Sequence, residues 1–147
     1  MITQISQKRH LAKTITWRVV GTLDTILLSW IVTGNPFTGL KIGFSETFTK
    51  LILYYLHERV WVRVNLDENK ELKESRVRHI IKTITWRVIG TIDTVILSWM
   101  ISGDALTGLK IGGAELATKP ILYYLHERGW YKSDYGINKV TKTTKNE

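Results

Sequence analysis

The chain has 147 residues, a formal net charge of +8 and a mean hydropathy of −0.07. It contains no cysteine, which excludes disulfides, thiolate metal ligands and a cysteine nucleophile. A positive charge of this size suits a nucleic-acid binder, an anionic membrane surface or an acidic partner, so the positions of the basic residues must decide between these classes.

The sequence contains one long segment twice. Residues 13–61 align without a gap on residues 82–130, at an offset of 69, and about two thirds of the aligned residues are identical. A half of this length is one supersecondary unit that cannot bury its apolar face alone, so we expect the halves to fold together. The predicted organisation is a basic N-terminal segment (1–12), a first helical hairpin (13–61), a cytoplasmic connector (62–78), a second helical hairpin (79–131) and a basic flexible tail (132–147).

Each repeat holds two apolar segments separated by a short turn, at residues 15–32 and 40–56 and again at 84–101 and 109–125. Each segment would be roughly 25–27 Å long as a helix, which is just enough to cross a hydrocarbon core. Apolar residues occur on all sides of these segments rather than on one stripe. We therefore predict an all-α integral membrane protein with four transmembrane helices, arranged as two parallel-repeat helical hairpins.

The basic residues are expected on one side of such a membrane protein. Lysine and arginine are frequent before the first apolar segment, between the second and third, and after the fourth, whereas the turns at 34–38 and 103–107 contain neither. This asymmetry predicts a multi-pass protein of the bacterial inner membrane with both termini in the cytoplasm. The alternative, a soluble four-helix domain with a basic surface, gives no reason for the asymmetry, and nucleic-acid binding explains the charge less economically.

Charged residues recur inside the apolar segments of both copies. In an antiparallel hairpin Asp24, Glu46 and Lys50 lie within roughly 6 Å of one another in depth, so we expect Asp24 to reach Lys50. Such residues either form structural salt bridges or line a polar path for an ion or solute. The sequence thus predicts an intramembrane charge cluster in each repeat, formed by Arg18, Asp24, Glu46 and Lys50 and by their copies Arg87, Asp93, Glu115 and Lys119.

Small residues and one proline predict further features of the helices. Glycines at four-residue spacing favour close helix packing in membranes. The predicted packing positions are Gly21, Gly39, Gly43, Gly90, Gly108 and Gly112. Leu51 of the first repeat is replaced by Pro120 in the second, and a proline inside a helix frees a carbonyl one turn earlier, so we predict a kink beside Lys119.

Motifs typical of enzymes are missing from the sequence. The segments His57-Glu58-Arg59 and His126-Glu127-Arg128 contain no H-E-x-x-H metal pair, and neither a phosphate-binding loop nor a serine-base arrangement is visible. We expect no catalytic residues, no metal and no cofactor.

The repeated core K-T-I-T-W-R-x-x-G-T-x-D-T, followed by G-L-K-I-G-x-x-E-x-x-T-K-x-I-L-Y-Y-L-H-E-R, closely resembles a family of small prokaryotic predicted membrane proteins known as a domain of unknown function. The resemblance covers both halves and implies a tandem duplication of one hairpin. It also implies that single-hairpin relatives self-associate, and it implies a link of genomic context with sulfate activation. No catalytic residues come with the family.

Two functions remain open at this point. The first is a conduit or transporter for a small ion or solute, with an anion favoured because Arg18, Lys41 and Lys50 outnumber the two acids of their repeat. The second is a non-catalytic accessory or scaffold subunit that docks a cytoplasmic enzyme or a permease, with a link to sulfate assimilation. The expected partners are the lipid bilayer, another copy or another membrane protein and, for the second function, a cytoplasmic protein.

Overall fold

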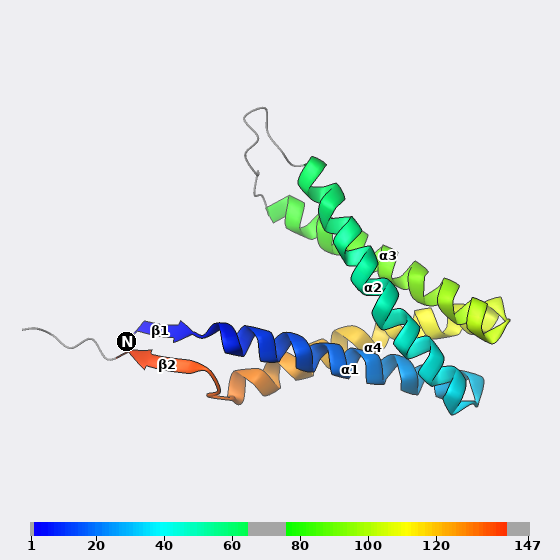
Figure 1. Ribbon diagram of the computed structural model, residues 1–147, viewed down its shortest axis with the longest axis horizontal. Helices are drawn as coiled ribbons and strands as arrows, with labels where there is room; N and C mark the ends of the chain where they lie inside the picture. The colour runs from blue at the N-terminus through cyan, green and yellow to red at the C-terminus, as the bar shows by residue number, and fades with distance from the viewer. Residues whose placement is uncertain (1, 65–75, 141–147) are drawn as a thin grey trace, which may run out of the picture.

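The computed structural model describes residues 2–64 and 76–140. It contains four long helices, α1 (Gln7–Thr33), α2 (Pro36–Val64), α3 (Arg76–Ser102) and α4 (Ala105–Lys132). The two expected hairpins are α1–α2 and α3–α4 (Figure 1). Gly34 and Gly103 end α1 and α3 with φ angles of 70° and 78°, which only glycine adopts easily.

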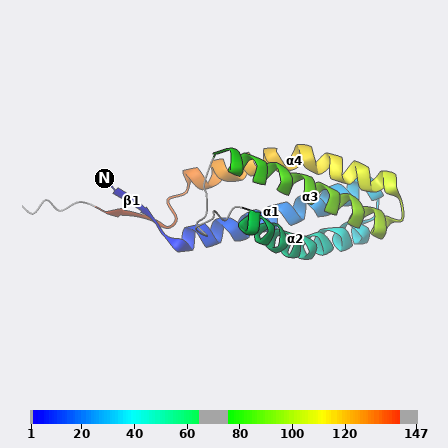
Figure 2. The ribbon, with the colours of Figure 1, turned by 90° about the horizontal axis from the view of Figure 1, so that it is seen from above.

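The two repeats interlock rather than lie apart. Each helix packs against its hairpin partner and also against one helix of the other repeat, α1 against α4 and α2 against α3. Away from the turns the helices diverge into two arms, the α1–α4 arm and the α2–α3 arm (Figure 1). The view from above shows the α3–α4 hairpin beside the α1–α2 hairpin (Figure 2). Each arm therefore combines one helix from each repeat.

Contacts between the repeats follow a pseudo-twofold symmetry. In the α2–α3 arm the His57 Nε2 lies 2.9 Å from the Thr85 Oγ1. In the α1–α4 arm the equivalent atoms of His126 and Thr16 are also 2.9 Å apart. Exchanging the two repeats converts one contact into the other, so each arm repeats the interface of its counterpart.

Burial is inverted relative to a soluble helical bundle. Among the described residues, Ile42 and Ile111 are the only buried hydrophobic side chains, and the other buried side chains are polar or charged. The helices α1 and α3 are long and apolar enough to cross a membrane, yet only 11% and 17% of their most apolar stretches are buried. Apolar side chains thus face outward over a polar interior, as in a protein that lipid surrounds. Two of the four predicted membrane spans, α1 and α3, therefore meet the criterion of length and apolar composition by themselves.

The two ends of the chain form a structure that the sequence did not predict. The strands β1 (Ile2–Ile5) and β2 (Ile137–Val140) pair in antiparallel register, with Ile2 opposite Val140. The Arg9 guanidinium secures this end because it donates hydrogen bonds to the carbonyl oxygens of Trp130, Ser133 and Tyr135 at 2.5, 2.8 and 2.5 Å. Within the predicted flexible tail, residues 137–140 form β2, while residues 141–147 and most of the predicted connector, 65–75, lie outside the described residues.

Candidate functional site

Asp24, the one acidic residue of α1, has its ion-pair partner on the other repeat. The Lys119 Nζ lies 3.5 Å from the Asp24 Oδ2 and 3.2 Å from the Glu115 Oε1, while the Thr118 Oγ1 donates to Asp24 at 2.9 Å. The prediction that Asp24 reaches Lys50 within its hairpin is wrong. Lys50 lies at the depth predicted for such a contact. In the arm, however, α1 packs against α4, so the lysine that faces Asp24 is Lys119.

The copy of this arrangement adjoins it in the centre of the molecule. Lys50 pairs with Glu46 one turn earlier, and its Nζ also lies 3.5 Å from the Glu115 Oε2 on α4. The Asp93 carboxylate accepts a hydrogen bond from the Thr49 Oγ1 at 2.8 Å. The two predicted clusters are therefore one central charge cluster, formed by Asp24, Glu46, Lys50, Asp93, Glu115 and Lys119.

Two fully buried threonines, Thr25 and Thr94, connect the charges of the cluster. The Thr94 Oγ1 lies 3.0 Å from the Glu115 Oε2, and the Lys50 Nζ donates to it at 3.2 Å. Thr25 donates to the other Glu115 oxygen and accepts from the Lys119 Nζ at 3.0 Å. The cluster prediction omitted these threonines, although each follows an aspartate in the repeated T-x-D-T motif, a signal that could have included them.

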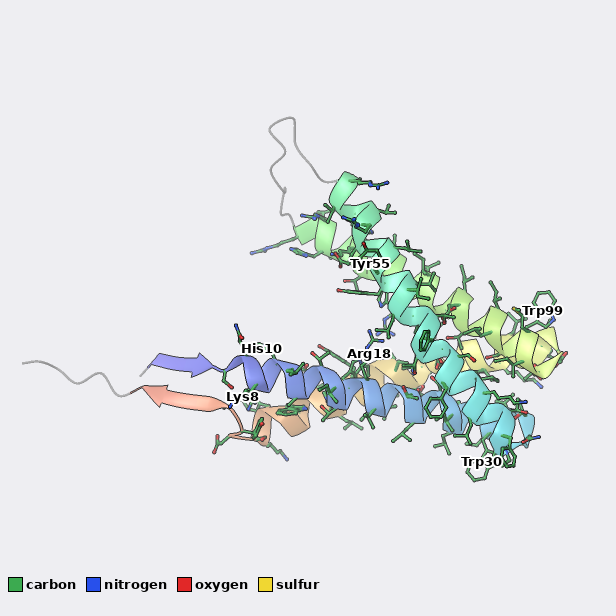
Figure 3. All side chains as sticks on the ribbon, viewed as in Figure 1. Lys8, His10, Arg18, Trp30, Tyr55 and Trp99 are labelled. Atoms are coloured by element: carbon green, nitrogen blue, oxygen red, sulfur yellow. The ribbon has the colours of Figure 1, made fainter. Side chains whose placement is uncertain are left out.

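A cavity of about 660 Å³ lies between the two arms, on the side of the cluster away from the turns. Figure 3 shows Arg18 in the angle between the arms. Arg87 lines the same cavity from α3, and within residues 2–64 and 76–140 neither guanidinium has a hydrogen-bond or ion-pair partner. The two arginines thus lie on the cavity side of the central charge cluster and do not join its ion pairs. The cavity is also lined by Glu46, Lys50, Glu115, Lys119, Trp17, Trp86, Tyr54, Tyr123 and several threonines.

The molecule is closed on the turn side of the cluster. Ile42 and Ile111 are fully buried there, and the predicted packing glycines bring the hairpin helices together. A Cβ on Gly39 would lie 2.7 Å from the Ile26 carbonyl oxygen. Three further glycines lie in equally close contacts with the neighbouring helix, at Gly43, Gly108 and Gly112.

Two of the predicted packing glycines, Gly21 and Gly90, line the cavity instead, and Pro120 follows Lys119, which also lines it. A Cβ on Gly21 would lie 3.7 Å from the Lys119 Nζ, and a Cβ on Gly90 would lie 3.8 Å from the Lys50 Cε. Both distances are ordinary van der Waals contacts. The helix α4 continues through Pro120. Leu116, whose carbonyl loses its helical N–H partner at this proline, lines the cavity.

Each arm ends in an ion pair that joins the repeats. The Lys82 Nζ lies 2.6 Å from Glu58, and the Lys13 Nζ lies 2.7 Å from Glu127. The hydrogen bond from Lys82 holds the pKa of the Glu58 carboxyl below its ordinary value, and Lys13 does the same for Glu127. These carboxyls lie beyond the apolar segments, at the basic ends of α2 and α4.

We expect acid to loosen the arms. A carboxyl whose pKa is lowered by folding stabilises the folded protein above its ordinary pKa, and this contribution is lost as the pH falls through the lowered value. The melting temperature of the protein in detergent should therefore fall between about pH 6 and about pH 3. The double variant Glu58→Gln with Glu127→Gln should show a smaller fall, and parallel curves for the two proteins would contradict this expectation. The effect is modest because about a third of each side chain is exposed, 32% and 34%.

An apolar exterior, a polar interior and an internal duplication define a helical membrane protein of the repeated-hairpin type. The chain belongs to the family described as "Predicted membrane protein (DUF2061)", which matches residues 11–62 and again residues 80–131. The two matches coincide with the two hairpins and confirm the tandem duplication of a domain of unknown function. The chain matches no curated protein and no solved structure. In the described part of the chain, no group of three or more His, Asp or Glu side chains could hold a metal ion.

Proposed function

We propose that the protein binds a small anion in the cavity between the arms and conducts it across the membrane. The observation that carries this proposal is the pair of guanidinium groups, Arg18 and Arg87, that line the cavity without a partner in the described part of the chain. Arg18 is half-buried and Arg87 is exposed, so a charged ligand that enters the cavity can reach both guanidinium groups, and charged groups at membrane depth favour an opposite charge beside them. An anion in the cavity supplies that opposite charge.

The chemistry of the cavity wall favours an oxyanion. Guanidinium groups bind sulfate, phosphate and carboxylate through paired hydrogen bonds, because their N–H donors match the spacing of the oxygens. Threonine hydroxyls add neutral polar groups to the wall, among them those of Thr22 and Thr47, whose Oγ1 atoms lie 2.9 Å apart in a mutual hydrogen bond. Sulfate is the first anion to test, because the family resemblance implies a context of sulfate activation.

The membrane setting of the proposal follows from charge and from closure. We place the basic end in the cytoplasm of a bacterial inner membrane, with four helices spanning the bilayer and both termini inside. The cavity then faces the cytoplasm, and the packed turn side, with Ile42 and Ile111, faces outward. Conduction requires a second form in which this packing opens, and self-association in the bilayer provides a further seal.

The arginines provide the direct test of anion conduction. We expect purified protein in liposomes to take up sulfate or phosphate, and the double variant Arg18→Gln with Arg87→Gln to lose at least about tenfold in uptake, the effect of losing about 1.4 kcal/mol of anion binding. Folding should be unaffected, because neither side chain has an ion-pair partner in the described residues. The exposed lysines near the turns supply the control, as Lys41→Gln with Lys110→Gln should keep its uptake. Equal uptake by both double variants would contradict the proposal.

A second candidate function is a scaffold that docks a cytoplasmic enzyme or a permease. The observation that favours it is the exposed basic surface at the ends of the arms, which includes Arg59, Arg63, Arg128 and Lys132. Such a surface suits an acidic partner. Recovery of one stoichiometric protein with the intact chain but not with a variant that carries glutamine at these four positions, together with absent anion flux, would favour the scaffold.

A further inference from the structure

The central charge cluster contains more acids than bases. The cluster holds four carboxylates, those of Asp24, Glu46, Asp93 and Glu115, and two ammonium groups, those of Lys50 and Lys119. Arg18 and Arg87 form no ion pair with any of these acids in the described part of the chain. An excess of ionised carboxylates in a low-dielectric interior is costly, and a proton on one of them removes part of that cost.

Glu46 and its copy Glu115 have different partners, although both are buried. Both oxygens of Glu115 are occupied, Oε1 by Thr25 and Lys119 and Oε2 by Thr94 and Lys50. Glu46 is 3% exposed, and its Oε1 contacts Lys50 and Thr94, but its buried Oε2 has no hydrogen-bond partner. An ionised carboxylate oxygen left without a donor is the costly state, so Glu46 is the acid best suited to hold a proton.

The hydroxyl of Thr94 cannot serve both glutamates at once. Three acceptors surround its oxygen, the Gly90 carbonyl at 3.1 Å, the Glu46 Oε1 at 3.3 Å and the Glu115 Oε2 at 3.0 Å. A hydroxyl donates one hydrogen, so at least one of the two carboxyls gains nothing from it. Glu46, at the longest distance, is the weakest competitor for that hydrogen.

We infer that Glu46 carries an exchangeable proton and that the protein moves its anion together with a proton. Glu46 lines the cavity, so its proton can exchange with water there. The charged groups around it are Arg18 and Asp24 on α1, Lys50 on α2, Arg87 and Asp93 on α3, and Glu115 and Lys119 on α4.

The coupling follows from the shared lysine. When Glu46 is ionised, Lys50 is shared between Glu46 and Glu115; when Glu46 is protonated, Lys50 has Glu115 as its one charged partner, and the cavity wall carries one negative charge fewer towards an anion. Proton binding therefore favours anion binding, and by linkage the anion favours the proton to the same extent. This inference rests on the proposed anion conduction for its transport step, but the proton on Glu46 can be measured by itself.

Liposomes with an acid exterior test the coupling. With the membrane potential clamped at zero, sulfate that enters with one proton should accumulate about tenfold for each unit of pH difference. A pH dye inside the vesicles should report the accompanying protons. Glu46→Gln should make sulfate accumulation independent of the pH difference, whereas Glu58→Gln, which changes a carboxyl at the end of an arm, should keep the dependence. Sulfate uptake by the unmodified protein without protons would overturn the inference and leave the proposed function standing.

Infrared spectroscopy in lipid tests the proton without any flux. The unmodified protein at neutral pH should show the carbonyl band of a protonated carboxyl, and this band should disappear in Glu46→Gln and remain in Glu58→Gln. If the glutamine variant does not fold, Glu46→Asp keeps the titratable group and should shift the band. A spectrum without the band overturns the inference. Absence of sulfate, phosphate and chloride flux beside an intact band overturns the proposed function and the coupled transport step, and leaves the proton on Glu46 standing.

Discussion

Replacing Lys50 and Lys119 together by methionine is expected to prevent the protein from accumulating in folded form. The two ammonium groups are the ion-pair partners of Glu46, Glu115 and Asp24. Removing one partner of a buried pair costs about 3–5 kcal/mol because the other charge stays buried and uncompensated. Two such losses compare with a total stability of about 5–15 kcal/mol for a typical domain. The measurement is the amount of monodisperse protein that a mild detergent extracts from the membrane.

A matched pair of lysines and a compensating variant make this prediction specific. Lys41→Met with Lys110→Met removes the same charge from α2 and α4 at exposed positions near the turns, and it should leave the yield unchanged. Adding Glu46→Gln and Glu115→Gln to the first double variant should restore part of the yield, because it removes two of the three acids that were left unpaired. Equal yields from the two methionine pairs would show that the central ion pairs do not hold the fold.

The hairpins could be predicted because their signals are local. The repeat, the lengths of the apolar segments and the turn glycines Gly34 and Gly103 all lie in continuous stretches of sequence. The choice of cluster residues also came from a local signal, a charge inside an apolar segment. Such signals predict whether a segment is a helix and how far along that helix a residue lies.

The pairing of the charges could not be predicted in the same way. Asp24 lies at the depth of both Lys50 and Lys119, and only the packing of α1 on α4 selects Lys119. The unequal surroundings of Glu46 and Glu115 are invisible in the sequence, because the two residues occupy identical positions of the repeat. The pairing of β1 with β2 likewise joins the two ends of the chain, a contact that no short window contains.

The close approach of the hairpin helices at Gly39 and Gly108 predicts the second large effect. Gly39→Ala with Gly108→Ala should open both hairpins near their turns, since a Cβ would lie 2.7 Å from the Ile26 carbonyl oxygen and 2.5 Å from that of Val95. Both obstacles are backbone atoms, which cannot rotate away as a side chain can, so the helices must separate. Overpacking of this kind costs about 1–3 kcal/mol at each site, and the melting temperature in detergent should fall.

The control for this prediction changes the same residue type where there is room. A Cβ on Gly113 of α4 would meet nothing within 4 Å. Alanine is also a better helix former than glycine by about 1 kcal/mol, so Gly113→Ala should keep or raise the melting temperature. The two predictions differ in sign, and an equal rise for the Gly39 and Gly108 variants would mean that the hairpin helices do not approach as closely as described. Because the same contacts close the turn side of the cavity, a destabilised Gly39 and Gly108 variant should also let anions leak when reconstituted in liposomes.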